Sequence, residues 1–138
     1  MNAAALSNLH CAPDAALLDA QELAATMKEA LNHWQATLAA DDDVIDLIQL
    51  DEGTIRAPLQ ATSITRNYGF NDFHQTMAFV NAITTMIHRE DHHPTMFISY
   101  KECRLSFNTH DANGVTLNDL ICAAKCDVIF DAHRAKSI

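Results

Sequence analysis

The strict alternation of side chains in residues 103–109 limits the possible folds of this chain most strongly. Apolar residues at Cys103, Leu105 and Phe107 are separated by the polar residues Arg104, Ser106 and Asn108. A period of two residues is that of a β-strand with one buried and one exposed face. Because such a sheet must cover its apolar face with a second layer, we expect helices packed on that face.

The surrounding segments supply both kinds of element. β-branched and aromatic runs predict strands at 44–50, 61–70 and 95–100, beside the strand at 103–109. Apolar residues at helical spacing predict helices over 15–36, over 72 to about 90 with Asn71 as the N-cap, and over 117 to about 132. Thr116 and Asp119 have the spacing of a capping box for the last helix. The order predicts an α+β fold, a two-layer sandwich.

Length and charge exclude several classes of protein. The 138 residues fit a single domain, 1–138, in which 1–36 form an N-terminal extension and first helix. Nine basic residues against 18 acidic ones argue against a nucleic-acid surface. No apolar run reaches the roughly 20 residues of a membrane span, and the N-terminus lacks the basic start of a signal peptide. Four cysteines without a CxxC pair indicate a reduced, cytoplasmic protein.

Residues 88–94, His-Arg-Glu-Asp-His-His-Pro, allow three interpretations. His88 and His92 are four residues apart, so a continuous helix would place both on one face, as in helical zinc sites. A third ligand would have to be His93 or the distant His110, and there is no HExxH motif, which disfavours a metal centre. Alternatively, the histidines are a solvated helix end that interacts favourably with the helix dipole.

The third interpretation is acid–base chemistry. Histidine titrates near neutral pH, so two histidines around one ligand can donate one proton and remove another. His92 and His93 follow the predicted helix, and His110 follows the strand pair in Asn-Thr-His-Asp-Ala-Asn-Gly. Ends of rigid elements are where side chains are presented to a pocket, so these three histidines can converge on one site.

The same residues resemble the motif of the pterin-4a-carbinolamine dehydratase family. His88 is followed after three residues by His92-His93-Pro94, after five more by Tyr100, after nine by His110 and after eight by Asp119. The flanking stretches 68–83 and 109–124 also resemble the family, and the similarity extends from about residue 64 to residue 132. Glutamate is common in the family where this chain has His88.

The resemblance implies a four-stranded antiparallel sheet with helices on one face, assembled into homodimers or homotetramers. It implies dehydration of 4a-hydroxytetrahydropterin to quinonoid dihydropterin, following aromatic amino-acid hydroxylation, without a metal or organic cofactor. We expect His92 and His110 to be the acid–base pair and His93 to orient the pterin. Pro94, Thr109, Asp111 and Ala112 would line the ring site, and Asp119 would orient His110 or hold its loop.

One segment departs from the family pattern. The span from Trp34 to Phe70 is longer than is usual in the family. The extra residues are the stretch 39–59, which carries six carboxylates. The family includes a dimerisation cofactor of a transcription factor and proteins that resemble RuBisCO assembly factors, in which catalysis is dispensable. An assembly or chaperone role, with a protein client bound through the acidic surface, is therefore the alternative to the enzyme.

Overall fold

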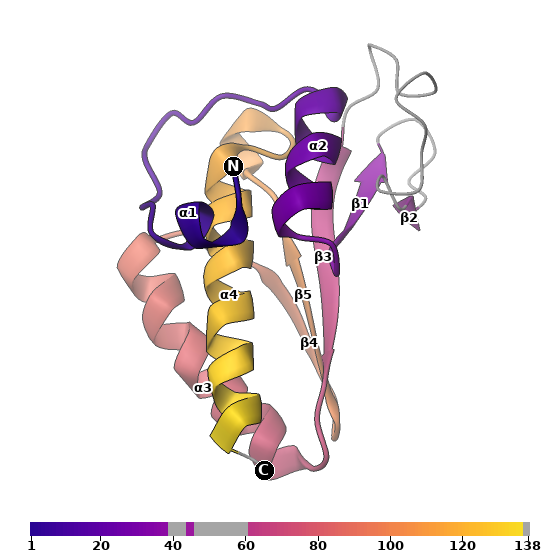
Figure 1. The fold of residues 1–138 in the computed structure, drawn as a ribbon, viewed down its shortest axis with the longest axis vertical. Coiled ribbons are helices and arrows are strands. Elements are labelled where there is room, and N and C mark those ends of the chain that lie inside the picture. The colour runs from indigo at the N-terminus through magenta and orange to yellow at the C-terminus, as the bar shows by residue number, and fades with distance from the viewer. Residues whose placement is uncertain (39–43, 46–60, 137–138) are drawn as a thin grey trace.

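The computed structural model describes residues 1–38, 44–45 and 61–136 (Figure 1). Its helices are α1 (Ala3–Ser7), α2 (Ala20–Ala30), α3 (Phe73–Glu90), the short 3₁₀ helix η3 (His110–Ala112) and α4 (Leu117–Lys136). Its strands are β1 (Gln35–Leu38), β2 (Val44–Ile45), β3 (Ala61–Gly69), β4 (Thr95–Ile98) and β5 (Glu102–Phe107).

These strands form one antiparallel sheet in the order β2-β1-β3-β5-β4. Four longer strands make up most of it, and the two-residue β2 adds a fifth strand at one edge. Figure 1 shows the helices gathered on one face of this sheet, with α4 beside both α1 and α3. The expected α+β sandwich, an antiparallel sheet covered by helices on one face, is confirmed.

The register of β3 and β5 explains the buried face. Ile64 pairs with Phe107 and Tyr68 pairs with Cys103, and all four residues are almost completely buried under the helices. The alternate positions form the other face, where Arg104 is exposed and lies over the Phe97 ring at 4.9 Å. The alternation seen in residues 103–107 therefore reports correctly which side of the sheet is covered.

Acidic residues cap both ends of helix α3, Asp72 before its first residue and Asp91 after its last. The predicted cap Asn71 is wrong by one position, because Asp72 accepts the hydrogen bond from the Gln75 amide at 2.8 Å. The helix ends at Glu90, and Asp91 has a left-handed conformation with φ of 53°. His92 therefore lies beyond the helix, so the shared helical face that would have joined it to His88 in a metal site does not exist.

The N-terminal helix is shorter than predicted. Instead of 15–36 it spans Ala20–Ala30, because the Asp19 side chain accepts the Glu22 amide at 2.8 Å and starts the helix there. The helix ends at Ala30, and residues 35–38 form β1, which pairs with β3. Of the predicted strand 44–50, Val44 and Ile45 are in β2, and the rest of the acidic stretch 39–59 lies outside the described residues.

Buried apolar side chains from every layer form the core between helices and sheet. The largest fully buried side chains are Trp34, Tyr68, Phe79 and Phe107. Trp34 makes an edge-to-face contact with Tyr68, whose ring in turn lies 4.7 Å from that of Phe79. Among the described helices, none has the length and apolar character that a bilayer span requires.

Candidate functional site

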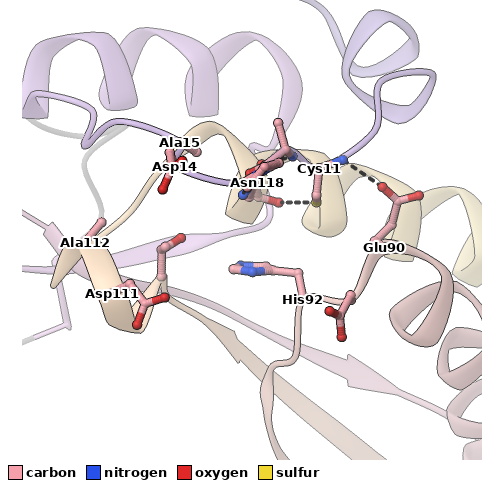
Figure 2. A pocket seen from close by; sticks show the side chains of 12 residues that line it. Cys11, Asp14, Ala15, Glu90, His92, Asp111, Ala112 and Asn118 are labelled. Atoms are coloured by element: carbon pink, nitrogen blue, oxygen red, sulfur yellow. Dashed lines mark hydrogen bonds between the residues drawn. The ribbon is translucent and has the colours of Figure 1, made fainter.

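A cavity of about 570 Å³ opens beside the end of α3. Its walls come from three segments: residues 11–15 of the N-terminal region, residues 90–92 at the end of α3, and residues of the connection from β5 into the first turn of α4. The volume is in the range of small-ligand pockets. Figure 2 shows the His92 ring extending into the space between Cys11 and Asn118 on one side and Asp111 on the other.

A buried carboxylate holds the His92 ring. His92 Nε2 donates a hydrogen bond to Asp119 Oδ1 at 2.5 Å, and the Asp119 side chain is completely buried. The second oxygen, Oδ2, accepts from the Thr109 hydroxyl at 2.8 Å and from the Thr116 amide at 2.9 Å. The Thr116 contact is one half of the predicted capping box of α4; in the other half the Asp119 amide donates to the Thr116 carbonyl at 3.1 Å instead of to its hydroxyl. Asp119 thus both contributes to the start of the helix and orients the histidine.

The surroundings of His92 favour its protonated form. The hydrogen bond to Asp119 raises its pKa above the ordinary value, and the opposing effect of burial is smaller. The ring also lies nearly parallel to the Phe107 ring, with 6.1 Å between centroids. Because Nε2 is engaged by Asp119, Nδ1 is the nitrogen left to meet a ligand. The arrangement is that of an oriented proton donor at a cavity wall.

The structure brings together only part of the expected site. His92, Thr109, Asp111 and Ala112 line the cavity, and Asp119 lies directly behind His92. His93, Pro94 and His110 are not among the lining residues. The His93 side chain is 61% exposed, with Nε2 3.9 Å from Asp91. His110 is exposed at the start of η3, whose other two residues, Asp111 and Ala112, reach the cavity wall.

Of the two roles expected for Asp119, the described contacts include none with His110, whereas the hydrogen bond from Thr109, the residue before η3, fits the second role of holding the His110 loop. Both Asp119 oxygens are occupied by His92, Thr109 and Thr116. The position of Asp119 in the first turn of α4 lets it contact both the chain that follows α3, through His92, and the residue before η3, through Thr109.

One wall of the cavity was missed by reasoning from sequence. Residues 10–15, here called the N-terminal strap, are held by Glu90 and Asn118. Glu90 accepts hydrogen bonds from the Cys11 amide at 2.8 Å and from His10 Nδ1 at 2.9 Å. Asn118 accepts from the Ala12 amide at 3.0 Å and donates to the Ala12 carbonyl at 2.8 Å. The strap is therefore held at the site by side chains of α3 and α4.

A signal for this wall was present in α3. Glu90 continues the apolar face formed by Ile83 and Ile87, and its side chain is only 2% exposed. A carboxylate on the buried face of a helix needs hydrogen-bond donors, although sequence does not say from where. Burial works to raise the Glu90 pKa, but the bonds from Cys11 and His10 and the charge of Lys125 outweigh it and lower the pKa.

Metal ligands are not assembled here. In residues 1–38, 44–45 and 61–136, no three His, Cys, Asp or Glu side chains are grouped so that they could hold a metal ion.

Comparisons with known proteins show which family this chain resembles. A provisionally named pterin-4-alpha-carbinolamine dehydratase of Nitrosomonas europaea is 48% identical over 84 residues, which cover 61% of this chain and 72% of that protein. A protein of the same name from Hydrogenovibrio crunogenus is 46% identical over 74 residues, 54% of this chain and 66% of its own length.

A solved structure of a transcriptional coactivator/pterin dehydratase from Brucella melitensis shares 34% identity, with a TM-score of 0.48. That match covers 49% of this chain and 72% of the other. The family model described as pterin 4 alpha carbinolamine dehydratase matches residues 16–129, which include β1, the whole of α3 and the His92–Asp119 pair. This chain belongs to the pterin 4 alpha carbinolamine dehydratase family.

Proposed function

We propose that this protein catalyses the dehydration of 4a-hydroxytetrahydropterin to quinonoid dihydropterin, in tetrahydropterin recycling, with His92 as the proton donor. The observation that carries the proposal is the His92–Asp119 pair at the wall of a cavity of small-ligand size. Family membership supports the substrate class.

The first chemical demand is a proton for the leaving group. The 4a-hydroxyl departs as water once its oxygen is protonated, and a general acid that is charged near neutral pH can supply that proton. The raised pKa of His92 increases its charged fraction at neutral pH. The buried Asp119 carboxylate both fixes the ring and stabilises the imidazolium, so Nδ1 of His92 is the proposed donor atom.

The second demand is removal of the proton on N5 of the pterin. We assign it to His110, because His110 begins the short helix that contributes Asp111 and Ala112 to the cavity wall. The His110 ring is exposed in this structure and would turn toward a bound pterin, since catalytic contacts often form only in the complex.

Binding of the ring is proposed to use the polar wall opposite the strap. The Asp111 carboxylate at the cavity can accept hydrogen bonds from the amino and ring N–H groups of a pterin. Ala112 supplies apolar contact at the wall, and Pro94 and His93, which lie outside the lining, are assigned contacts with the part of the ring nearest solvent. Thr109 is already tied to Asp119 and Thr116, so its contribution is to hold the wall in place.

The test is a stopped-flow measurement of 4a-hydroxytetrahydropterin decay with the wild type, His92→Ala and His110→Ala. We expect wild type to accelerate decay and each variant to lose roughly 10²- to 10⁴-fold, the usual contribution of one proton-transfer group. The matched control is His74→Ala. His74 is an exposed histidine in the first turn of α3, at the opposite end of the helix from His92, and its removal should leave the rate unchanged.

Two results would contradict the proposal. Folded wild-type protein that does not exceed the uncatalysed rate would exclude the enzyme and leave the assembly or chaperone role to be tested with protein partners. Full activity in His92→Ala would retain the enzyme but remove His92 from its mechanism.

A further inference from the structure

Two thiols face each other where the N-terminal strap meets α4. Cys11 Sγ lies 3.5 Å from Cys122 Sγ, although the two residues are 111 positions apart in the sequence. Cys122, in the second turn of α4, is completely buried, whereas Cys11 is partly exposed and lines the cavity. A small oxidant entering the cavity can therefore reach Cys11 but not Cys122.

Glu90 and Asn118 hold Cys11 in this position from both sides. The Cys11 amide donates to Glu90 Oε1, and the backbone of the next residue, Ala12, makes two hydrogen bonds with the Asn118 side chain. Figure 2 shows Cys11 between Glu90 and Asn118, with the His92 ring across the cavity. A disulfide requires about 2.05 Å between the sulfurs. The two sulfurs, now 3.5 Å apart, can reach this distance through a small shift of the strap. The strap residues 10–15 form no helix or strand that such a shift would disrupt.

We propose that Cys11 and Cys122 form a peroxide-responsive disulfide that fastens the N-terminal strap over the cavity beside His92. In the first step the Cys11 thiolate attacks one oxygen of a hydroperoxide. The O–O bond breaks, sulfur is oxidised to a sulfenic acid, and the peroxide is reduced to hydroxide or alkoxide. In the second step the Cys122 sulfur attacks the Cys11 sulfur, the S–OH bond breaks, and the hydroxyl leaves with the Cys122 proton as water.

The local electrostatics match these two roles. A hydrogen bond from Cys122 lowers the pKa of Cys11, with a further contribution from the charge of His92, and together these outweigh burial. A lower pKa increases the thiolate fraction, which is the form that reacts with peroxide. The pKa of Cys122 is raised by its hydrogen bond with Cys11 and by burial, so Cys122 remains protonated until the second step.

The other two cysteines provide an internal contrast. Cys103 and Cys126 are completely buried, and burial raises the pKa of Cys103 to about 11 and that of Cys126 well above its ordinary value. Neither lines the cavity. Oxidation should therefore select one pair among four thiols. This inference concerns the thiols and the strap, and it does not depend on the reaction proposed for His92.

The experiment treats the reduced full-length chain with a small excess of hydrogen peroxide and then alkylates the remaining thiols. Intact mass should show the loss of two hydrogens with two alkylated cysteines. Peptide mapping should join the Cys11 peptide to the Cys122 peptide and find Cys103 and Cys126 alkylated. Hydrogen exchange of strap amides should slow at least several-fold in the oxidised protein.

Variants separate the two steps. Cys122→Ala should stop at a Cys11 sulfenic acid that a dimedone probe labels. Cys11→Ser should lose peroxide reactivity at least tenfold. The control Cys103→Ala should form the same disulfide as wild type. The proposal is overturned if wild-type mapping finds no Cys11–Cys122 link, finds all four thiols oxidised alike, or finds only links between chains. That measurement on wild type decides the matter even if a variant does not fold.

Discussion

At the scale of single residues, the His92–Asp119 pair combines structure and chemistry. A completely buried carboxylate is costly unless its oxygens are hydrogen-bonded, and Asp119 satisfies this with a histidine, a hydroxyl and a backbone amide. Two of these partners, Thr109 and Thr116, are also joined by a 2.7 Å hydrogen bond. The orientation of His92 is therefore determined by a network that also starts α4.

The raised pKa of His92 makes this pair pH-dependent. A group whose pKa is higher in the folded than in the unfolded state stabilises the fold fully below its unfolded pKa of about 6.5. That contribution is lost as pH rises through the folded value. We expect the urea midpoint of wild type to exceed that of His92→Gln most at acid pH, with the difference shrinking as the pH rises above the unfolded pKa. A difference that is constant or grows with pH would contradict this account.

At the scale of elements, the N-terminal strap is held by side chains rather than by a ladder of backbone hydrogen bonds. Glu90 supplies the carboxylate, and Lys125 lies 4.0 Å away from it on α4. Helix α1, which precedes the strap, packs on α4, and the Lys125 amine donates to the Ser7 carbonyl at 2.9 Å. The end of α3 thus organises a segment about 80 positions earlier in the chain.

Removing the charge of Glu90 should loosen the strap. Hydrogen bonds to a charged group contribute roughly 1.5–3 kcal/mol, so Glu90→Gln should speed exchange of the Cys11 and Ala12 amides by about tenfold or more. The matched control is Glu29→Gln. Glu29 is an exposed glutamate that binds the N-terminal amine at 2.9 Å, and its loss should leave strap exchange within about twofold, since exposed pairs contribute little. Equal effects of the two variants would contradict the role given to Glu90.

At the scale of the whole molecule, Asp127 connects the helix layer to the sheet. Its carboxylate accepts hydrogen bonds from Trp34 Nε1 at 3.1 Å, from Arg66 at 2.7 Å and from the Tyr68 hydroxyl at 2.5 Å. Arg66 and Tyr68 come from β3, the centre of the sheet, and Trp34 directly precedes β1. Burial raises the pKa of Asp127, and the three donors work against that shift.

Truncation of Asp127 should therefore lower global stability. Asp127→Ala leaves the partly buried Arg66 cation and the buried Trp34 and Tyr68 donors without their acceptor, so we expect a loss of about 3–5 kcal/mol in the free energy of unfolding. Asp131→Ala is the matched control, because Asp131 is an exposed carboxylate one turn further along α4 and should cost less than about 0.5 kcal/mol. Urea denaturation of both variants measures the difference. A loss below about 1 kcal/mol for Asp127→Ala would show that packing alone joins the layers.

Features that depend on near neighbours in the chain could be predicted from the amino-acid sequence alone. Alternation in residues 103–107 indicated the covered face of the sheet, and helical spacing indicated α3 and α4 to within a few residues. Thr116 and Asp119 indicated the side-chain bond of Asp119 to the Thr116 amide, which is one half of a capping box. The predicted start of α2 was too early. Residues 15–18 are alanine and leucine, which favour a helix, but the helix begins only after its N-cap Asp19. Periodicity and capping act over a few residues, so a sequence pattern contains them.

Which distant residues come into contact depends on how the helices and strands pack together. His92 and Asp119 were both candidates, but their partnership depends on how α4 packs behind the end of α3. The strap wall, the facing thiols of Cys11 and Cys122, and the donors around Asp127 join positions that are 59 to 111 residues apart. Such contacts follow from the packing of whole elements around one core, and no local pattern in the chain specifies that packing.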